Sequence, residues 1–284
     1  MKDLVALVPD LLALSMQAGD AITERYHADE PLTVESKSDD TPLTRADLDA
    51  HTVLSKGLRA LTPGIPLLSE ESPDSELAQR REWHKLWLVD PLDGTKEFIG
   101  RTGEFTVNIA LIDDHRPVLG VLYVPLERSA YVGIPGLGAW RYRCQKDGTW
   151  RRTVIRTRAL QDGHPLLVLA SRRHNGPGIR RCLSWLENHW GPIARSNSGS
   201  ALKFCHMAEG DGDFYPRFSP CSEWDTGAGQ ALLEGAGGCL LGMDGAPLRY
   251  NERKTLLSPH FYAIADPGHT LWKLLLGRNA DAAG

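Results

Sequence analysis

The chain is short of cysteine, and it has none of the closely spaced cysteine pairs that hold zinc or build a disulfide framework. Its 284 residues contain five cysteines, at positions 144, 182, 205, 221 and 239. Small secreted domains and zinc sites need paired cysteines, so an odd and widely spaced set argues against both. This usage fits a reducing compartment, and we expect a cytoplasmic protein.

An excess of positive charge is also absent. Lysine and arginine number 32 against 36 aspartates and glutamates, which gives a net charge of −4. Nucleic-acid surfaces depend on clustered cationic side chains, so this balance argues against general affinity for DNA or RNA. Arginine is frequent between positions 141 and 181, but few aromatic residues separate these arginines. We interpret that segment as a solvated rim.

Long hydrophobic runs are missing as well. Residues 4–16 are apolar on average, but Asp3, Pro9 and Asp10 interrupt them and no small-residue cleavage site follows. Leucines recur there at helical spacing, which predicts an amphipathic helix packed on its own domain. No apolar run approaches the roughly 20 residues that a spanning helix needs. We therefore expect no integral membrane segment.

The most informative stretch joins an apolar strand to a carboxylate-rich turn. Residues 86–89 are continuously apolar, as in a strand covered on both faces, and Asp90 and Asp93 follow them. Because a proline separates the two acids, we expect the strand to stop near Asp90. Gly94 permits a sharp turn and Thr95 can cap the next element. Such a turn suits a divalent cation and a phosphate, although Asp-Gly is also an ordinary turn.

Three more acids stand at the predicted ends of elements. Asp47 follows Thr44 as in an N-terminal helix box, where complementing the helix dipole is the alternative role. Glu70 follows a short strand whose end can lie beside Asp90. Asp225 opens a helix, where a simple cap is the alternative. With no histidine or cysteine among them, these acids favour Mg²⁺ or Mn²⁺, and paired ions about 3.5–4 Å apart are typical of phosphoryl transfer.

A turn-rich break near residues 163–165 divides the chain into two predicted domains. Residues 1–160 read as two helices followed by an antiparallel-rich sheet, an α+β arrangement that carries most of the acids. In residues 161–284 strands and helices alternate, which predicts a mainly parallel or mixed α/β sheet. This second domain would supply Asp225.

Residues 90–95 together with Trp224 and Asp225 resemble the motifs of the inositol monophosphatase superfamily of metal-dependent, lithium-sensitive phosphatases. Four further segments resemble its bisphosphate nucleotidase branch: residues 93–99, 103–108, 200–205 and 215–218. The resemblance covers nearly the whole chain. It implies a layered α-β-α-β-α sandwich with a catalytic cleft between its two halves.

The same resemblance implies a reaction. The substrate would be adenosine 3',5'-bisphosphate, whose 3'-phosphate is hydrolysed to leave AMP, and 3'-phosphoadenylyl sulfate would be a second substrate, both in sulfate assimilation. An inositol-1-monophosphatase with the same metals is the alternative enzyme. A non-catalytic nucleotide-binding sensor is the alternative of another class, but a sensor would be expected to have lost an acid or Thr95, and all are present.

The resemblance also implies residue roles. Two or three Mg²⁺ ions would be held by Glu70, Asp90, the Leu92 carbonyl, Asp93 and Asp225. The attacking water would be activated by Asp47, Thr95 and Glu70. The substrate would be contacted by Glu70, Asp93, Gly94, Thr95, Lys96, His174, Ser200, Lys203, Arg217 and Asp225. Arg217 suits a second phosphate, because a planar guanidinium can bind one bidentately.

Two positions depart from the family pattern. Gly227 stands where alanine is usual, and Gly100 stands where a polar or basic residue is commoner. Neither is a predicted ligand, so they bear on helix stability more than on chemistry. The resemblance further implies a small-molecule substrate, a monomer or homodimer, and a cytoplasmic protein, with peripheral attachment at the cytoplasmic face of the inner membrane as described for some relatives.

Overall fold

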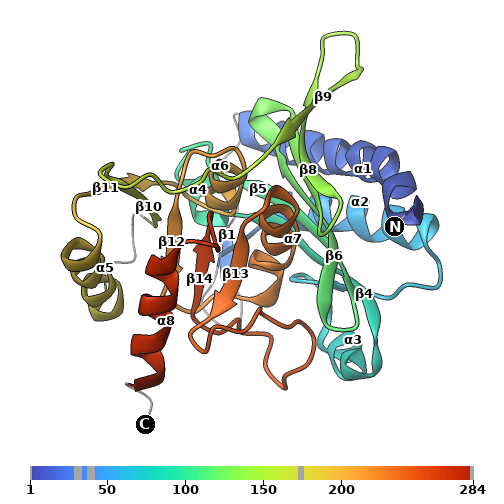
Figure 1. The fold of residues 1–284 in the computed structure, drawn as a ribbon. Coiled ribbons are helices and arrows are strands. Elements are labelled where there is room, and N and C mark those ends of the chain that lie inside the picture. The colour runs from blue at the N-terminus through green and yellow to red at the C-terminus, as the bar shows by residue number, and fades with distance from the viewer. Residues whose placement is uncertain (1, 29–33, 37–41, 172–175, 282–284) are drawn as a thin grey trace.

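Two β-sheets alternate with three layers of helices in the computed structural model, which describes residues 2–28, 34–36, 42–171 and 176–281 (Figure 1). The helices are α1 (Lys2–His27), α2 (Arg45–Leu61), α3 (Asp74–Leu77), α4 (Thr95–Ile99), α5 (Pro177–His189), α6 (Leu202–Ala208), α7 (Gly227–Ala236) and α8 (Thr270–Asp281). Short 3-10 turns are η1 (Arg80–Glu82), η2 (Pro125–Glu127) and η3 (Glu223–Asp225).

The strands before the predicted break are β1 (Val34–Ser36), β2 (Pro42–Thr44), β3 (Leu67–Ser69), β4 (Lys85–Asp93), β5 (Thr106–Asp113), β6 (Arg116–Val124), β7 (Ser129–Ile134), β8 (Gly138–Cys144) and β9 (Trp150–Ile155). Those after it are β10 (Leu166–Ala170), β11 (Ile193–Asn197), β12 (Phe214–Arg217), β13 (Cys239–Gly242) and β14 (Phe261–Ile264). Helices α1 and α2 cover one side of the molecule, α5 and α8 cover the opposite side, and α6 and α7 lie between the sheets (Figure 1). The layered α-β-α-β-α sandwich is confirmed.

The larger sheet has seven strands in the order β3-β4-β5-β6-β7-β8-β9. Only β3 and β4 run parallel within it, and the other pairs are antiparallel. Its strand β4, next to the edge strand β3, is apolar on both faces. Leu86 and Leu88 point into the middle layer, whereas Trp87 and Val89 pack against the side that carries α1 and α2. This two-sided burial explains the continuous apolar run in the sequence.

The prediction that this strand stops near Asp90 is wrong. Strand β4 continues to Asp93, and its pairing with β5 shifts register between Asp90 and Asp93. A β-bulge therefore accommodates Pro91, which cannot donate to the ladder, without ending the strand. Thr95 is also not the cap of the next helix, because Gly94 takes that position in the left-handed conformation at φ 99°. The bulge and this glycine together turn the chain at the acidic motif.

Helix α7 approaches the larger sheet closely because two strand positions facing it are glycines. A Cβ atom on Gly133 would lie 2.2 Å from the Leu232 Cα atom, and one on Gly120 would lie 2.4 Å from the Ala228 carbonyl oxygen. A Cβ on Gly227 would come within 3.2 Å of the side chains of Leu88 and Ala110. Gly227, one of the two glycines that depart from the family pattern, thus lies in a tightly packed first turn, two residues after Asp225.

The second sheet has five strands in the order β11-β10-β12-β14-β13. Strand β10 pairs in parallel with β11 and β12, whereas β14 runs antiparallel to β12 and β13. This is the mixed sheet that the sequence predicts. Its outer face packs on α5 and α8, where Phe214 stacks on Trp272 with ring centroids 4.9 Å apart.

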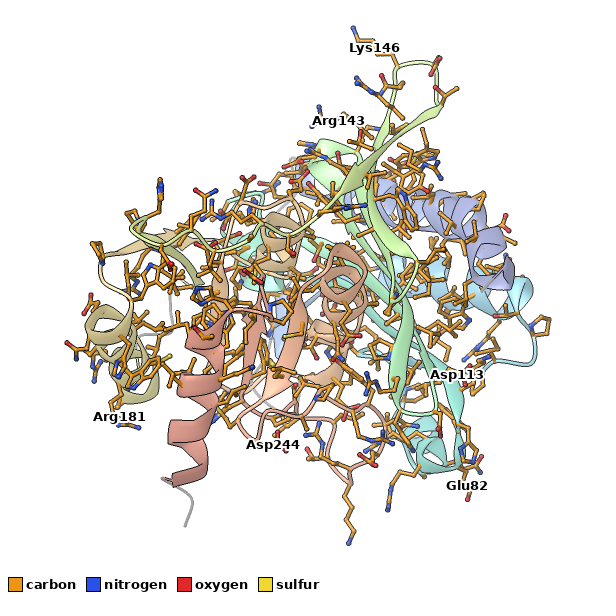
Figure 2. The ribbon with its side chains drawn as sticks, in the orientation of Figure 1. Glu82, Asp113, Arg143, Lys146, Arg181 and Asp244 are labelled. Carbon is orange, nitrogen blue, oxygen red and sulfur yellow. The ribbon has the colours of Figure 1, made fainter. Side chains whose placement is uncertain are left out.

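Several elements were not expected from the sequence. Val34–Ser36 pairs with Pro42–Thr44, and β9 and β11 add an edge to each large sheet. Strands β8 and β9 project as a hairpin, with Arg143 and Lys146 at its outer end (Figure 2). The two sheets lie on either side of Gly163 in the sequence, but α7 packs against β6 and one buried cluster includes residues from both halves. The division into two domains stays a prediction.

Among the described residues, α1 is the one helix long and apolar enough to cross a bilayer. Leu11, Ala18 and Ile22 on this helix are completely buried, and the helix packs against α2 and β6. A core helix of a folded protein can have the same length and apolar composition. The burial of these three side chains agrees with the predicted amphipathic helix that packs on its own domain.

Candidate active site

Three carboxylates from distant parts of the chain meet where β4 ends. Asp90 and Asp93 lie in the bulged end of β4, and Asp225 is the last residue of η3, just before α7. One carboxylate oxygen of each lies within 4.8 Å of the others. Only 2% of Asp90 is exposed. Oxygen atoms at this spacing can share a cation that binds its ligands at about 2.0–2.6 Å.

The electrostatics of this cluster favour a bound cation. Burial raises the pKa of Asp90 well above its usual range, and the nearby carboxylates of Glu70, Asp93, Asp225 and Asp47 raise it further. Burial likewise raises the pKa of Asp225 to about 8, with Asp93 adding to the shift and Arg217 opposing it. A divalent ion would relieve this repulsion between like charges. The donor set is all oxygen, so the residues present fit a hard cation such as Mg²⁺.

Glu70 lies beside this cluster because β3 and β4 are parallel neighbours. Its backbone N–H donates to the Val89 carbonyl at 3.0 Å, which places the end of β3 next to Asp90. Glu70 is not one of the three acids within 4.8 Å, yet its charge raises the pKa of both Asp90 and Asp225. The predicted neighbourhood of these two strand ends is confirmed.

The Leu92 backbone closes the turn of the acidic motif. Its N–H donates to Asp90 Oδ1 at 3.0 Å, and its carbonyl oxygen lies 3.3 Å from Thr95 Oγ1. Thr95 Oγ1 also lies 3.1 Å from Asp47 Oδ1, which accepts its hydrogen. The Leu92 carbonyl, which the resemblance implies as a metal ligand, is therefore next to the Thr95 hydroxyl.

The two carboxylate oxygens of Asp47 contact two different neighbours. Its Oδ2 accepts hydrogen bonds from the Thr44 backbone at 2.8 Å and from the Thr44 hydroxyl at 2.6 Å, which completes a capping box on α2. Its Oδ1 accepts the bond from Thr95 described above. The helix-cap role and the contact with the acidic motif, considered as alternatives from the sequence, are both present. Only 2% of Asp47 is exposed; its contact with Thr44 is buried, whereas its contact with Thr95 is partly buried.

Asp93 is held from the second half of the chain. Its Oδ2 accepts hydrogen bonds from the Ser200 hydroxyl at 2.9 Å, the Ala201 backbone at 2.7 Å and Asn108 Nδ2 at 3.3 Å. The Ser200 hydroxyl also lies 2.7 Å from Thr106 Oγ1. Ser200, predicted as a substrate contact, thus orients a carboxylate of the cluster. The role of Thr106 and Asn108 was missed, although two buried polar residues in the apolar strand β5 were a usable signal.

Lys203 supports the loop that contains Ser198 and Ser200. Its ammonium donates to the carbonyl oxygens of Ser198 at 3.0 Å and Ser200 at 2.6 Å, and only 2% of the residue is exposed. Burial lowers the pKa of Lys203 to about 8, while the charge of Asp93 opposes that shift. Two of its three N–H bonds therefore hold backbone, and one remains for a ligand.

A cleft of about 290 Å³ opens beside the carboxylates, between the two halves of the chain. Its lining includes Asp93, Gly94, Lys96, Ser200, Lys203, Arg217 and Asp225. A second cavity of about 520 Å³ adjoins it, and the two share Ser171, Tyr215 and Arg217 as wall. Seven of the predicted site residues therefore face one cleft. His174 lies outside the described residues.

Arg217 occupies the wall between these cavities. Its guanidinium donates to the Tyr215 hydroxyl at 3.2 Å, to the Pro220 carbonyl at 3.0 Å and to the Ser219 carbonyl at 3.4 Å. Three of its five N–H bonds are used in this way, which fixes the plane of the group and leaves two donors for a ligand.

Comparisons with known proteins agree with this geometry. The model of the inositol monophosphatase family matches residues 7–272. The chain is 44% identical over 255 residues to the 3'(2'),5'-bisphosphate nucleotidase CysQ of Escherichia coli K12, which covers 90% of this chain and 98% of that protein.

Solved structures resemble the whole chain as well. The crystal structure of CysQ from Bacteroides thetaiotaomicron has a TM-score of 0.76 and 36% identity, and covers 91% of this chain and 97% of that one. An inositol monophosphatase from Thermotoga maritima has a TM-score of 0.73 at 18% identity, covering 98% of this chain and 99% of that one. The second match shows the fold alone. The resemblance found in the sequence is confirmed.

The raised pKa of Asp225 predicts how the stability of the metal-free protein depends on pH. The folded carboxyl keeps its proton up to about pH 8, whereas an unfolded one releases it near pH 4. Between these values the folded state binds more protons, so the free energy of unfolding falls as pH rises. Asp225→Asn removes that titration. In a chelating buffer, we expect the melting temperature of the wild type to fall more steeply than that of the variant from roughly pH 5 to pH 9.

The control for this experiment is the same pair of proteins in saturating Mg²⁺. There the ion stabilises the ionised wild type, and the variant, lacking one carboxylate, should gain less. If the melting temperatures of wild type and Asp225→Asn changed with pH to the same extent in the chelating buffer, Asp225 would not be a carboxyl that retains its proton in the folded state.

Proposed function

The chain belongs to the inositol monophosphatase family, and on that basis we propose that it is a 3'(2'),5'-bisphosphate nucleotidase, acting on adenosine 3',5'-bisphosphate. The observation that carries this proposal is the meeting of Asp90, Asp93 and Asp225 beside a cleft that Asp93, Asp225 and Arg217 line. The carboxylates suit a metal that engages one phosphate, and the guanidinium suits a second phosphate. Curated relatives that cover almost the whole chain carry the name of this activity.

We propose that two or three Mg²⁺ ions bind at this site. Glu70, Asp90, the Leu92 carbonyl, Asp93 and Asp225 are the residues that would hold them. When bound, these ions supply charge for the transferring phosphoryl group and lower the pKa of water. The support is the all-oxygen donor set and the charge repulsion that raises the pKa of Asp90.

In the proposed reaction the oxygen of water bonds to phosphorus, the bond from phosphorus to O3' breaks, and O3' takes up a proton. Thr95 donates its hydroxyl hydrogen to Asp47, so its oxygen lone pairs remain to accept a proton from the attacking water. Gly94 and Thr95 begin α4, where the first backbone N–H groups have no partner within the helix. Those groups, with Lys96 beside them in the cleft, would orient the phosphate under attack.

The proposal extends to substrate choice and cellular role. Hydrolysis of 3'-phosphoadenylyl sulfate would follow from the same site, since only the group at the 5' position differs. Removing adenosine 3',5'-bisphosphate would serve sulfate assimilation, in which this nucleotide is a by-product. We propose a cytoplasmic protein, monomeric or dimeric, that acts on small nucleotides.

Asp47 and Thr95 are expected to act as one unit. Thr95→Ala and Asp47→Asn should each lower kcat by about 100- to 10,000-fold, because each breaks the same proton-accepting pair. The double variant should be little worse than either single one, since residues that act together are not additive. Steady-state phosphate release with saturating substrate and Mg²⁺ measures all three.

Thr44→Ala is the matched control for this pair. It removes the hydrogen bond from the Thr44 hydroxyl to Asp47, keeps the bond from the Thr44 backbone and does not touch Thr95, so it should cost about 1 kcal/mol of stability and leave kcat unchanged. If the two single losses multiplied in the double variant, Asp47 and Thr95 would not act as one unit. If Thr44→Ala lowered kcat as much as Asp47→Asn, the effect of Asp47 would be that of a helix cap.

Arg217 is expected to read the phosphate that is not hydrolysed. Arg217→Ala should lower kcat/KM for adenosine 3',5'-bisphosphate by roughly 10- to 150-fold, as a charge-assisted bidentate contact is lost. The loss with 3'-AMP, which lacks the 5'-phosphate, should be much smaller. Phosphate release from both nucleotides by wild type and variant measures the difference.

The control variant is Arg143→Ala, since that arginine is exposed on β8 and does not line the cleft (Figure 2). It should leave both values of kcat/KM unchanged. Equal losses on the two nucleotides in Arg217→Ala would place Arg217 at the hydrolysed phosphate or in the fold. A wild-type preference for inositol 1-phosphate over the bisphosphate would overturn the nucleotidase assignment in favour of an inositol monophosphatase.

A further inference from the structure

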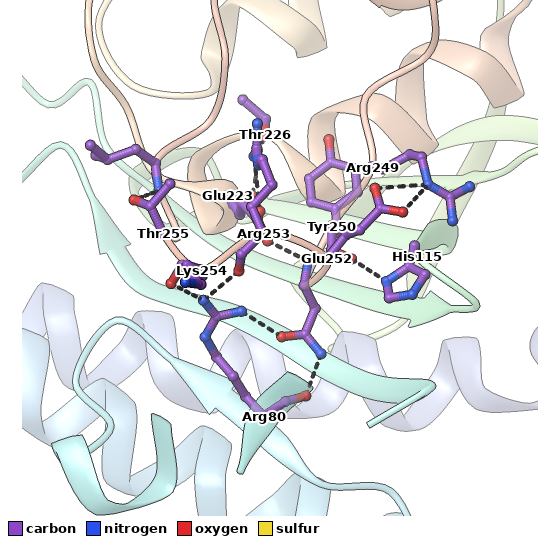
Figure 3. A network of polar contacts seen from close by, with 12 residues as sticks. Arg80, His115, Glu223, Thr226, Arg249, Tyr250, Glu252, Arg253, Lys254 and Thr255 are labelled. Atoms are coloured by element: carbon purple, nitrogen blue, oxygen red, sulfur yellow. Dashed lines mark hydrogen bonds and ion pairs between the residues drawn. The ribbon is translucent and has the colours of Figure 1, made fainter. Parts of the chain in front are cut away.

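A buried polar network joins the two halves of the chain (Figure 3). We call it the Glu223 network, and its members are Arg80, Glu223, Asn251 and Arg253. Arg80, Glu223 and Asn251 are each at most 3% exposed. Arg80 lies in η1, between the predicted ligands Glu70 and Asp90 in the sequence, whereas Glu223 opens the turn that ends at Asp225.

The contacts within this network are dense. Glu223 accepts hydrogen bonds from the Asn251 backbone at 2.6 Å and from the Arg253 guanidinium at 2.9 Å. Arg80 donates to Asn251 Oδ1 at 2.9 Å, to the Arg253 carbonyl at 2.9 Å and to the Lys254 carbonyl at 2.7 Å. Asn251 Nδ2 returns a bond to the Arg80 carbonyl. Each carboxylate oxygen of Glu223 therefore has a donor, and Asn251 links Glu223 to Arg80.

The loop that contains Asn251 is bound to both halves of the chain. On the N-terminal side, the Tyr250 carbonyl lies 2.8 Å from His115 Nδ1, and Asn251 contacts Arg80 (Figure 3). On the other side, the Leu256 carbonyl accepts from the Glu223 backbone at 2.8 Å. Asn251 adopts a left-handed conformation at φ 56°, which asparagine tolerates better than most residues. The loop is thus a strap that joins η3 to η1 and to the turn between β5 and β6.

Asp225 lies in the short turn that the side chain of Glu223 joins to this strap. The turn η3 has three residues, and its hydrogen bonds are local: Asp225 Oδ2 accepts from the Ser222 backbone at 3.1 Å, and the Thr226 hydroxyl donates to the Glu223 carbonyl at 3.1 Å. These bonds orient the Asp225 carboxylate within the turn. The packing of η3 and α7 on the larger sheet brings the turn close to β4, where Asp90 and Asp93 lie. The side chain of Glu223 adds a polar connection, through Asn251 and Arg80, to η1, which precedes β4 in the sequence.

We propose that Glu223 is a positioning residue for metal binding, which acts through Asn251, Arg80 and Arg253 to hold Asp225 at ligand distance from Asp90 and Asp93. The inference rests on the metal role proposed above. It assigns no chemical step to Glu223, which contacts neither the cleft nor the three acids by any observed hydrogen bond. Glu223 acts on the affinity of the site for the cation, because binding requires all three carboxylates to be in place at once.

The variant Glu223→Gln tests this proposal. The glutamine keeps the shape of the side chain, but its NH₂ group must face a donor, either the Asn251 N–H or the Arg253 guanidinium. Binding of Mn²⁺ to the full-length protein without substrate, followed by electron paramagnetic resonance, reports affinity independently of activity. We expect the dissociation constant to rise about 10- to 100-fold, as for other residues that orient metal ligands.

Arg253→Gln is the milder second variant, since the Arg253 side chain is 34% exposed and its loss leaves the bond between Glu223 and Asn251 intact. Its dissociation constant should rise by less than that of Glu223→Gln. The matched control in the same loop is Glu252→Gln, which removes only the exposed ion pair with Arg249 and should leave Mn²⁺ affinity unchanged. Leu186→Ala, in the outer layer, lowers stability without touching the network and should also leave the affinity unchanged.

The outcomes separate this inference from the proposed function. If wild type binds Mn²⁺ and folded Glu223→Gln or Arg253→Gln binds it equally well, the positioning role is overturned and the metal site stands. If Leu186→Ala weakens binding as much as Glu223→Gln at equal loss of melting temperature, the effect is one of general stability and the role is again overturned. Failure of the wild type to bind Mn²⁺ would overturn both assignments.

Discussion

Repulsion between crowded carboxylates is the constraint on which the rest of this structure depends. Asp90 is buried among four other acids, and Asp225 shares the same small volume. Without a cation such a cluster retains protons or pushes itself apart, because the charged forms are poorly solvated. Packing and hydrogen bonds from the rest of the chain must therefore hold these side chains together.

The fold supplies that support from several directions. The parallel pairing of β3 with β4 brings Glu70 to Asp90, and the bulge after Asp90 returns Asp93 to the same side. Glycines at positions 120 and 133 let α7 lie against the larger sheet, so the turn that precedes the helix reaches the acids. Ser200 and Ala201 then hold Asp93 from the second half of the chain. Each contact alone is ordinary, and together they leave the cluster little freedom to expand.

Much of this arrangement could be predicted from local sequence. The apolar run before Asp90, the glycine after Asp93 and the box at Thr44 and Asp47 each carry a local signal that the structure reproduces. The continuation of β4 past Pro91 could not be predicted in this way, because a bulge depends on pairing with β5. The contacts of Lys203 with backbone carbonyls also have no local signal, since a lysine in a phosphatase motif suggests a substrate contact. Arg80 and Asn251 are 171 positions apart, and no spacing rule connects them.

The central claim is that acids from both halves of the chain hold divalent cations around Asp90. Crystals grown with Mn²⁺ and measured at a wavelength with strong manganese anomalous scattering test it most directly. The account predicts two anomalous peaks about 3.5–4 Å apart, with Asp90 bound to both, Glu70 at one and Asp93 with Asp225 at the other. Absence of any peak within ligand distance of Asp90, in crystals where Mn²⁺ is bound elsewhere, would contradict it.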